Sequence, residues 1–459
     1  MANENKKVVV VGGDAAGLSA ASAIRRFKKD WSIVVYEKGE YISYAACGIP
    51  YYVAGWVKDI QSMITITKEE FLEKRDIAVK TCHEVVKVDV KGRQVVVKDL
   101  NSGQEFTDAW DCLVIATGAS PQLLPVPGVD LPRVFTVRGL ESAIALRQFI
   151  GEHKPKSACV IGASYIGLEM AEGLREAGVE RITMVKRTPR LMPAFPEKVS
   201  ELLHEELGRH GIRVVSGSRV AGLRALASDG GVEIVLDPRV EGVSSFDLVL
   251  VGTGVTPNTG FLKGSGIALD GNGAVDVDEF MQTSVPGVWA AGDCANVRHS
   301  LLGRRVYYPL ATIANKQGRY AGYCIAGKKT AFPGTAGTII TKVFDLSISK
   351  TGLTLEQAKA MGYDADESSI THEDLARYYP GTRDVFVSIV VDVVSHAILG
   401  ASIAGSPIAA KKIDVFVALI ASKTKLEDVR MLDFAYAPPF SPVYDAIQIA
   451  ADVASKKLR

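Results

Sequence analysis

The sequence has few of the features that stabilise small secreted domains or anchor a chain in a membrane. Its six cysteines are scattered along 459 residues without a CxxC pair, so we expect no disulfide framework, no zinc site and no other metal ligands. The polar first residues lack the apolar segment of a secretory signal. The longest uncharged stretch, residues 393–410, contains Ser, His, Gly and Pro and predicts a core strand with a turn, not a membrane span. These absences predict a reduced, cytoplasmic compartment.

An excess of charge of one sign is also missing. The formal net charge is +1, so the chain lacks the large basic field that would favour nucleic acid or an anionic membrane as a partner. What is present is typical of a globular α/β protein with tight turns: 47% hydrophobic residues, 23% charged residues and 43 glycines. The length predicts about three domains.

The chain carries the same strand–turn–helix–strand pattern twice. The first copy is predicted at residues 7–11, 12–17, 18–27 and 32–36. The second copy is predicted at residues 157–161, 162–167, 168–177 and 182–185. Residues 111–118 predict a buried strand followed by a turn, and residues 247–254 repeat this pattern. Two such units predict two Rossmann-like dinucleotide sites in an α/β fold.

The first unit has the features of an FAD site. A glycine-bearing turn lets the backbone approach a pyrophosphate, whose charge the following helix N-terminus favours. Asp14 replaces the usual middle glycine, but Glu37 stands twenty residues past Gly17, where a carboxylate accepts the ribose hydroxyls. Downstream, a short predicted strand ends at Asp293, and a helix is predicted to begin near residues 309–312. This strand, aspartate and helix together resemble the flavin-ribityl motif of flavoproteins with two dinucleotide domains. The expected FAD contacts are Gly12, Ala15, Ala16, Gly17, Glu37, Lys38, Val85, Ala116, Thr117, Gly118, Gly292, Asp293, Leu310, Ala311 and Thr312.

The second unit predicts an NAD(P)H site. Ser164 stands where the middle glycine is usual and is small enough for close approach. An acid at position 186 would favour NADH, but Lys186 and Arg187 stand there with Arg190 near, and such cations attract a 2′-phosphate. We therefore expect NADPH, or use of both NADPH and NADH. The expected contacts are Gly162, Ser164, Tyr165, Ile166, Gly167, Lys186, Arg187 and Gly254, with Tyr165 covering the flavin face.

A cysteine follows the expected FAD ribose acid by ten residues. Segment 41–52 contains Cys47, which this arrangement places near the flavin, where a thiolate can attack a disulfide. The other five cysteines fall in strand or helix contexts and are expected to be structural, although Cys294 follows Asp293 directly. The sequence resembles the single-cysteine branch of the pyridine nucleotide-disulfide oxidoreductases over residues 12–444. The cysteine segment and segment 433–440 are the most specific motifs of this resemblance. That branch contains coenzyme A (CoA) disulfide reductases, persulfide and polysulfide reductases, and NADH oxidases and peroxidases.

The resemblance implies a homodimer that reduces a CoA disulfide, CoA persulfide or polysulfide through a mixed disulfide on Cys47. It implies that Tyr378 and Tyr436 reach the active site from the partner subunit and assist the leaving thiol. The CoA contacts that it implies are Ser19, Arg26, Ser43, Arg75, Asn315 and Tyr444.

Three positions separate this chain from other members that it resembles. Tyr52 stands five residues past Cys47, where dithiol reductases have their second cysteine. Ala15 occupies the position of the histidine that is usual in peroxidase and oxidase members, and this removes support for peroxide chemistry at Cys47. Ala46 replaces an asparagine that often precedes the cysteine, which places strict specificity for CoA disulfide in question.

The predicted architecture is α/β, with two Rossmann-like domains as in glutathione reductase and a C-terminal α+β dimerisation domain. The expected domains are FAD-binding at 1–118 and 246–330, NAD(P)H-binding at 119–245 and dimerisation at 331–459. Segments 119–127 and 327–337 are predicted connections, and the part after residue 338 predicts alternating strands and two helices. Two alternatives remain open: an NADH oxidase that reduces O2 at the flavin, and a redox sensor or electron-transfer flavoprotein that binds partners through its third domain.

Overall fold

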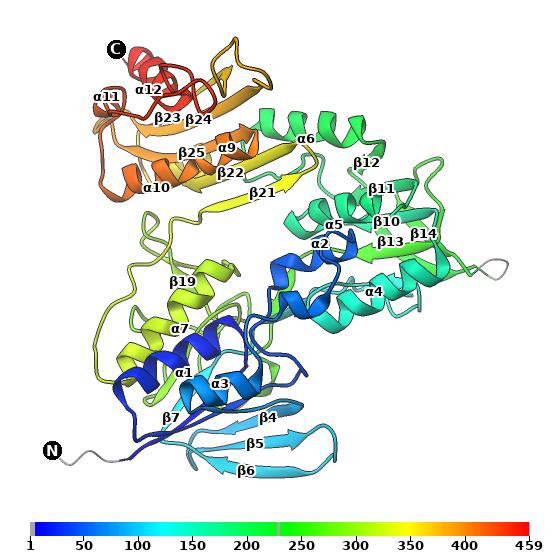
Figure 1. Cartoon of the computed structure of the whole chain (residues 1–459), viewed down its shortest axis with the longest axis vertical. Coiled ribbons are helices and arrows are strands. Elements are labelled where there is room, and N and C mark those ends of the chain that lie inside the picture. The colour runs from blue at the N-terminus through cyan, green and yellow to red at the C-terminus, as the bar shows by residue number, and fades with distance from the viewer. Residues whose placement is uncertain (1–4, 227–229, 459) are drawn as a thin grey trace.

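The computed structural model of the chain describes residues 5–226 and 230–458, so the first four residues of the polar start and Arg459 lie outside it. Three regions follow one another along the long axis, with the N-terminal end of the chain at the bottom of Figure 1 and the C-terminal end at the top. No helix in these described ranges is long and apolar enough to cross a membrane.

The first region is built on a parallel five-stranded sheet with the order β18-β7-β1-β2-β3. Its strands are β1 (Lys7–Val11), β2 (Ser32–Tyr36), β3 (Ala78–Lys80), β7 (Cys112–Ile115) and β18 (Val288–Ala290). The central strand β1 is a run of valines buried on both faces, as expected for a covered parallel sheet. Helices α1 (Ala15–Phe27) and α7 (Ala311–Ile325) lie side by side, and α3 (Lys68–Arg75) begins with a capping box.

The second region repeats this arrangement with the order β9-β16-β10-β11-β12, again all parallel. Its strands are β9 (Val134–Phe135), β10 (Ser157–Ile161), β11 (Arg181–Lys186), β12 (Ile212–Ser216) and β16 (Leu248–Val251). Its helices are α4 (Leu140–His153), α5 (Tyr165–Glu176) and α6 (Glu197–Arg209). The two sheets confirm the predicted pair of Rossmann-like units.

Both helices after the glycine turns begin three residues earlier than the sequence suggested. The carbonyl of Asp14 already accepts the N–H of Leu18 at 3.0 Å, and the carbonyl of Ser164 accepts the N–H of Leu168 at 2.9 Å. The last glycine of each turn therefore lies inside the first helical turn, and the predicted starts at residues 18 and 168 were wrong.

Each unit also carries an antiparallel three-stranded insertion, which directly precedes β7 in the first region and β16 in the second. These insertions are β4 (His83–Asp89), β5 (Gln94–Asp99) and β6 (Glu105–Ala109), and β13 (Arg219–Ala225), β14 (Val232–Asp237) and β15 (Ser245–Phe246). The predicted connection at 119–127 contains β8 (Ala119–Pro121), which pairs with β17 (Val255–Pro257). The remaining small elements are β19 (Val297–Arg298), β20 (Arg305–Val306), helix α2 (Ile49–Val53) and the 3₁₀ helices η1 (Ala46–Gly48), η2 (Ile60–Met63) and η3 (Gly260–Leu262).

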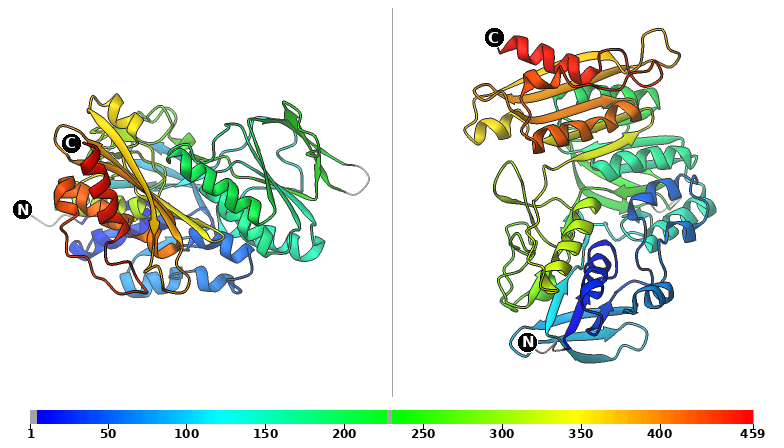
Figure 2. Two further views of the ribbon diagram at one scale, coloured as in Figure 1. Left: turned by 90° about the horizontal axis from the view of Figure 1, so that it is seen from above. Right: turned by 60° about the vertical axis from the view of Figure 1, so that its left-hand side comes forward.

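The third region is an antiparallel sheet with the order β21-β22-β25-β24-β23, and Figure 2 shows it at the end of the molecule opposite the N-terminal end. Its strands are β21 (Ile339–Val343), β22 (Leu346–Gly352), β23 (Ala365–Glu373), β24 (Asp384–Asp392) and β25 (Ile398–Gly405). Its helices are α8 (Leu355–Ala360), α9 (Pro407–Lys411), α10 (Ile413–Ala421), α11 (Leu426–Val429) and α12 (Ala446–Lys457). The described part thus has five helices where two were predicted, because three are too short to show helical periodicity. The apolar faces of α9 to α12 share one core with β24 and β25.

Buried carboxylates of the second region hold the turn between β21 and β22. Glu172 accepts the backbone N–H of Phe344 at 2.9 Å and pairs with the Lys342 amine at 2.6 Å. Glu206 accepts the N–H of Asp345 at 2.7 Å. These contacts join the second and third regions, while the exact domain boundaries stay a prediction.

Candidate functional site

The first glycine turn, between β1 and α1, has no room for side chains at two positions. Gly12 has a φ of +113°, and a Cβ placed on it would lie 2.1 Å from the carbonyl oxygen of Ala116. A Cβ on Gly17 would lie 1.9 Å from the carbonyl oxygen of Gly12. Asp14 makes no side-chain cap hydrogen bond, so the N–H groups of the first turn of α1 are left for a ligand. This geometry suits a pyrophosphate.

Two carboxylates beside this turn are desolvated. Glu37, at the end of β2, accepts the N–H of Gly13 at 2.6 Å and that of Gly39 at 2.7 Å. Burial raises the pKa of Glu37, and these two hydrogen bonds oppose the rise. Burial also raises the pKa of Asp14 to about 6. Glu37 is thus fixed where a ribose hydroxyl would be bound.

A cavity of about 480 Å³ opens beside Glu37, and it brings together Gly12, Glu37, Lys38, Val85 and Thr117 from the predicted FAD set. The amine of Lys38 pairs with Glu84 at 2.7 Å. Sequence reasoning missed Ser120 and Asn258 in the wall of this cavity.

Those two residues are hydrogen-bonded to each other and to the backbone that follows β7. The hydroxyl of Ser120 donates to Asn258 Oδ1 at 2.7 Å, and Asn258 Nδ2 donates to the carbonyl of Thr117 at 2.9 Å. The one sequence signal for Asn258 is its place just after the repeated turn at 247–254.

The rest of the predicted FAD set gathers where α1, β7, β18 and the start of α7 meet. Ala15, Ala16 and Ala116 lie in one small apolar cluster. A Cβ on Gly292, whose φ is +84°, would lie 2.8 Å from that of Ala16. Gly118 has a φ of +67° and open space around it. These alanines and glycines leave the backbone open to close approach, so a flat ring could lie against it.

Asp293 follows β18 and forms an ion pair with Arg138, a residue that sequence reasoning missed. The hydroxyl of Tyr307 donates to the carbonyl of Asp293 at 2.9 Å. Leu310 caps α7 without a side-chain hydrogen bond, and Ala311 and Thr312 are exposed at its first turn. The free N–H groups of this helix end are suited to a partial negative charge. The donors and small residues together fit FAD.

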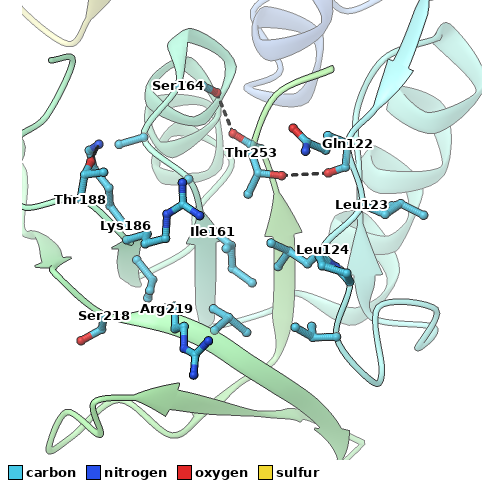
Figure 3. A pocket seen from close by; sticks show the side chains of 18 residues that line it. Gln122, Leu123, Leu124, Ile161, Ser164, Lys186, Thr188, Ser218, Arg219 and Thr253 are labelled. Carbon is cyan, nitrogen blue, oxygen red and sulfur yellow. Dashed lines mark hydrogen bonds between the residues drawn. The ribbon is translucent and has the colours of Figure 1, made fainter. Parts of the chain in front are cut away.

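The second glycine turn opens on a cavity of about 600 Å³, shown in Figure 3. Gly162 has a φ of +102°, and a Cβ on it would lie 2.5 Å from the carbonyl oxygen of Gly252. Ser164 Oγ accepts the N–H of Gly167 at 3.2 Å and donates to the carbonyl of Gly252 at 2.7 Å. Ser164 therefore caps α5 and links the glycine turn by a hydrogen bond to Gly252, the residue that follows β16.

Four predicted residues line this cavity: Gly162, Ser164, Lys186 and Arg187. Figure 3 places Lys186, Thr188 and Ser218 across the cavity from Gln122 and Leu123. The other predicted contacts, Tyr165, Ile166, Gly167 and Gly254, are not among the lining residues.

The cation cluster differs from the expected one. The guanidinium of Arg190 bonds to the carbonyl of Phe195, and Arg190 lines another cavity beside β22. Arg219, which sequence reasoning missed, takes its place as the third cation of this cavity, and Ser218 and Thr188 add two hydroxyls to the wall.

Tyr165 and Glu169 lie on successive turns of α5. Tyr165 is half-buried, and burial raises its pKa well above the ordinary range. Glu169 accepts the Thr341 hydroxyl at 2.7 Å, and burial raises its pKa as well. A Cβ on Gly173 would lie only 2.9 Å from the carbonyl oxygen of Pro50, so α5 touches α2 closely.

Cys47 lies in η1, directly before α2, and its side chain reaches solvent. The surrounding protein nevertheless desolvates the thiol and raises its pKa, and the charge of Glu169 adds to this rise. Arg138 opposes it. Of the other cysteines, Cys82 and Cys294 lie in turns, not in the predicted strands or helices. Cys294 is fully buried, which raises its pKa and keeps it from solvent.

A separate cavity of about 340 Å³ brings together five of the six residues expected to bind CoA. These are Ser19, Arg26, Ser43, Arg75 and Asn315. Ser19 Oγ bonds to Asn315 Oδ1 at 3.0 Å. Arg319 and Tyr323, one and two turns further along α7, also line the cavity and were missed. Three arginines line this cavity together with Ser43, which stands four residues before Cys47. Cations beside the cysteine segment suit an anionic nucleotide with a thiol arm.

The three tyrosines expected at the active site lie on the third region, away from these cavities. Tyr378, Tyr436 and Tyr444 are 75%, 46% and 66% exposed, and none lines the cavities described above. A hydrogen bond to Tyr378 raises the pKa of Tyr436. The single chain therefore does not bring these side chains to Cys47.

Comparisons with known families and relatives agree with this geometry. A family model described as pyridine nucleotide-disulphide oxidoreductase matches residues 6–318, and the dimerisation-domain model of that family matches residues 338–446. An NAD(P)H coenzyme A polysulfide/persulfide reductase of Pyrococcus horikoshii is 38% identical, with 98% of this chain and 99% of the relative covered. An NADH oxidase of Methanocaldococcus jannaschii is 35% identical, with 98% and 99% covered.

Solved structures give the same result. Reduced CoADR-RHD of Bacillus anthracis matches with a TM-score of 0.94 at 31% identity, over 99% of this chain and 81% of that one. An NAD-dependent persulfide reductase from A. fulgidus matches with a TM-score of 0.92 at 35% identity, over 98% and 83%.

Proposed function

The chain belongs to the pyridine nucleotide-disulphide oxidoreductase family, and on that basis we propose that it is an FAD-dependent NAD(P)H oxidoreductase acting through Cys47. Its acceptor is a CoA disulfide, a CoA persulfide or a polysulfide, and it works as a homodimer. The observation that carries this proposal is the cavity whose lining combines Arg26, Arg75 and Arg319 with Ser43, a residue of the cysteine segment. Relatives named for CoA-dependent sulfur reduction support it.

The chemistry assigned to the chain begins at Cys47. Its thiolate attacks one sulfur of the acceptor, so a bond forms between Cys47 and that sulfur while the acceptor's own S–S bond breaks. The other sulfur leaves as a thiolate. FAD, when bound, supplies the electron pair taken as hydride from NAD(P)H, which reduces the mixed disulfide and frees Cys47 and the second thiol.

The remaining roles belong to side chains that bind, orient or donate a proton. Arg26, Arg75 and Arg319 hold the phosphates of the nucleotide end of the acceptor. Tyr165 would cover the face of a bound flavin and would give way to nicotinamide. The phenols of Tyr378 and Tyr436 of the partner subunit donate a proton to the leaving thiolate.

Anaerobic turnover with single acceptors tests this function. We expect consumption of NADPH or NADH with CoA disulfide, CoA persulfide or polysulfide, and the Cys47→Ser variant should lose this turnover entirely, since no thiolate remains to form the mixed disulfide. Turnover of a CoA disulfide by Cys47→Ser would overturn the mechanism. Multiple turnovers by the wild type exclude the sensor alternative.

The oxidase alternative is supported by the relative named NADH oxidase, which is similar over nearly the whole chain. It predicts fast turnover with O2 and none with disulfides or polysulfide. Ala15 argues against it. Its methyl group stands where the resemblance implies a histidine, lines the same cavity as Ser43, and can donate no hydrogen bond to an oxygen species.

A further inference from the structure

A further cavity, of about 340 Å³, lies where the second region meets the third. One wall is the segment between β11 and α6, which contributes Arg190. The facing wall is the sheet of the third region, which contributes Lys350, Ser388 and Ser402 from β22, β24 and β25. Figure 1 shows α6 lying against this sheet. A ligand in this cavity would therefore contact both regions.

The polar residues of the sheet form a row across three neighbouring strands. Ser402 is paired with Lys350 on one side and with Ser388 on the other. Lys350, Ser388 and Ser402 are only 6%, 1% and 8% exposed. Further along the same face, Phe386 and Ala404 belong to an apolar core. Because buried polar groups are costly unless they are bonded, this row indicates a binding surface.

Lys350 is a buried cation without a counter-charge. Within the described ranges its amine makes one hydrogen bond, to the carbonyl of Ala194 at 3.2 Å, although an ammonium has three donors. Burial lowers the pKa of this amine to about 8. Burial, followed by the charges of Lys350 and Arg304, lowers the pKa of His299 to about 4, so that ring is neutral. Lys350 therefore keeps donors and an uncompensated charge for a ligand.

Arg190 is the second cation of this cavity. Its guanidinium donates to the carbonyl of Phe195, while its buried Nε has no partner among the described residues. In the part of the chain that the structure describes, neither Arg190 nor Lys350 takes part in an ion pair. The two cations bond to consecutive carbonyls, those of Ala194 and Phe195, which brings them to neighbouring peptide units. Two such cations suit a ligand with two negative charges.

Carboxylates line this cavity too, but they do not neutralise the cations. Glu367 accepts the hydroxyl of Ser388 at 2.5 Å. Glu197 and Glu356 are exposed in the first turns of α6 and α8, where water and salt screen their charge. The buried groups of this cavity that still need a charged partner are therefore the two cations.

We propose that this cavity binds a doubly charged oxyanion, such as phosphate or sulfate, between Lys350, Arg190 and the hydroxyl of Ser402. The oxyanion supplies the missing counter-charge and bonds to both regions at once. Helix α6 begins in the wall of the cavity at Pro196, which caps it without a side-chain hydrogen bond, and the positive end of its dipole adds to the attraction. This site is separate from the cavities assigned to the cofactors and the acceptor, so it goes beyond the proposed function.

The test is calorimetric titration of the FAD-loaded protein with sodium sulfate at constant ionic strength. CoA and adenosine 2′,5′-bisphosphate are added first, so that they occupy the two other cation-lined cavities. We expect one sulfate per chain with a Kd of about 1 mM or below. Lys350→Met and Arg190→Met should each weaken binding at least about tenfold, the effect of one charge-assisted hydrogen bond. Arg190→Lys should retain part of the affinity, because it keeps the charge.

Lys359→Met is the matched control. Lys359 is exposed on α8 and does not line the cavity, so its loss should leave sulfate binding unchanged. Methionine has nearly the shape of the lysine stem and needs no counter-charge, so Lys350→Met keeps the sheet face filled. No sulfate binding by the wild type, or equal binding by Lys350→Met and Lys359→Met, would overturn the proposal.

Selenate soaked into crystals of the FAD-loaded protein locates the anion. The anomalous peak of selenium should lie within hydrogen-bond reach of Lys350 Nζ and the Arg190 guanidinium, and it should be missing in Lys350→Met. A wild type without a peak in this cavity would refute the site.

Competition against sulfate identifies the source of the oxyanion. Tighter binding of glycerol 3-phosphate than of inorganic phosphate would show that the phosphate belongs to a metabolite, and the reverse order would show a free ion. Binding of neither would contradict a phosphate site. None of these measurements needs turnover, so they decide the oxyanion site even if the chain reduces no disulfide.

Discussion

At the scale of single residues, the setting of Cys47 does not by itself make a strong nucleophile. The surrounding protein and the charge of Glu169 both raise the pKa of its thiol, and the charge of Arg138 opposes this rise. Below its pKa the group is a thiol, and the thiolate is the reactive form. In the single chain, Cys47 is therefore mostly protonated at neutral pH, and its activation depends on what binds beside it.

This setting predicts how Cys47 reacts with iodoacetamide. Alkylation of the FAD-loaded protein should be slow near neutral pH and should accelerate by about tenfold per pH unit up to the raised pKa. Glu169→Gln removes a negative charge, so it should shift the profile to lower pH and speed alkylation below the pKa by up to about tenfold. Peptide mass spectrometry of Cys47 measures the rates.

Glu176→Gln is the matched control, because Glu176 lies on the same helix and is exposed. It should leave the profile in place. Since burial also raises the pKa of Glu169, the difference between the variants should grow as the pH rises and this carboxyl ionises. Equal profiles for Glu169→Gln and the wild type would contradict the assigned effect of the Glu169 charge.

Sequence reasoning located residues whose role depends on local spacing. Gly12, Gly17, Gly162 and Glu37 stand at fixed distances along a strand–turn–helix unit, and the structure brings them to the expected places. It missed Arg138, Asn258, Arg219 and Arg319. These reach the cavities from distant segments through sheet order and helix packing, which a pattern of neighbours along the chain does not contain. Tyr378 and Tyr436 are a third case: they are exposed in the single chain, and their place beside Cys47 of a partner subunit stays a prediction.

At the scale of elements, α1 and α7 carry half of the glycines and alanines expected to contact FAD, and glycines set the separation of these two helices. A Cβ on Gly318 of α7 would lie 2.1 Å from the carbonyl oxygen of Ala16, and one on Gly322 would lie 2.6 Å from that of Ala20. The two helices therefore touch through backbone atoms. The sequence showed that α7 begins near residues 309–312, but it gave no sign of this contact, which arises only when the helices pack.

Gly318→Ala should separate the two helices. The added methyl group meets a backbone carbonyl that cannot rotate away, so we expect a loss of about 1–3 kcal/mol in the free energy of unfolding. FAD should also dissociate more readily, because the start of α7 and the glycine turn before α1 move apart. Urea unfolding and the flavin absorbance that remains after gel filtration measure the two effects.

Gly208→Ala is the control for the helix propensity of alanine. Gly208 lies in α6, and a Cβ there would have no heavy atom within 4 Å. The substitution should stabilise the protein by about 0.5–1 kcal/mol without changing FAD retention. If Gly318→Ala behaves like Gly208→Ala, the close contact of α1 and α7 does not constrain the flavin site.

At the scale of the whole molecule, the exposed apolar side chains of the third region need an explanation. Tyr378, Tyr436, Phe440, Val443 and Tyr444 are all exposed on two neighbouring loops, and the carbonyl of Pro438 joins these loops by accepting the N–H of Ala376. Such a group of apolar residues on one surface is typical of a protein interface. A dimerisation-domain model covers residues 338–446, which include all five. We therefore expect a particle of twice the 49.2 kDa chain mass in light scattering.

A mixing experiment tests whether the tyrosines act across that interface. Pure dimers of Cys47→Ser should be inactive, because no site has the nucleophile. Pure dimers of the double variant Tyr378→Phe/Tyr436→Phe should be weakly active, because every site lacks the proton donors. In a hybrid dimer one site combines the intact Cys47 of one chain with the intact tyrosines of the other. Random exchange makes half of the dimers hybrid, so about a quarter of the wild-type activity should return if the sites are shared in this way. If each site uses its own chain's tyrosines, both sites of the hybrid stay defective and activity stays at the mean of the two pure variants.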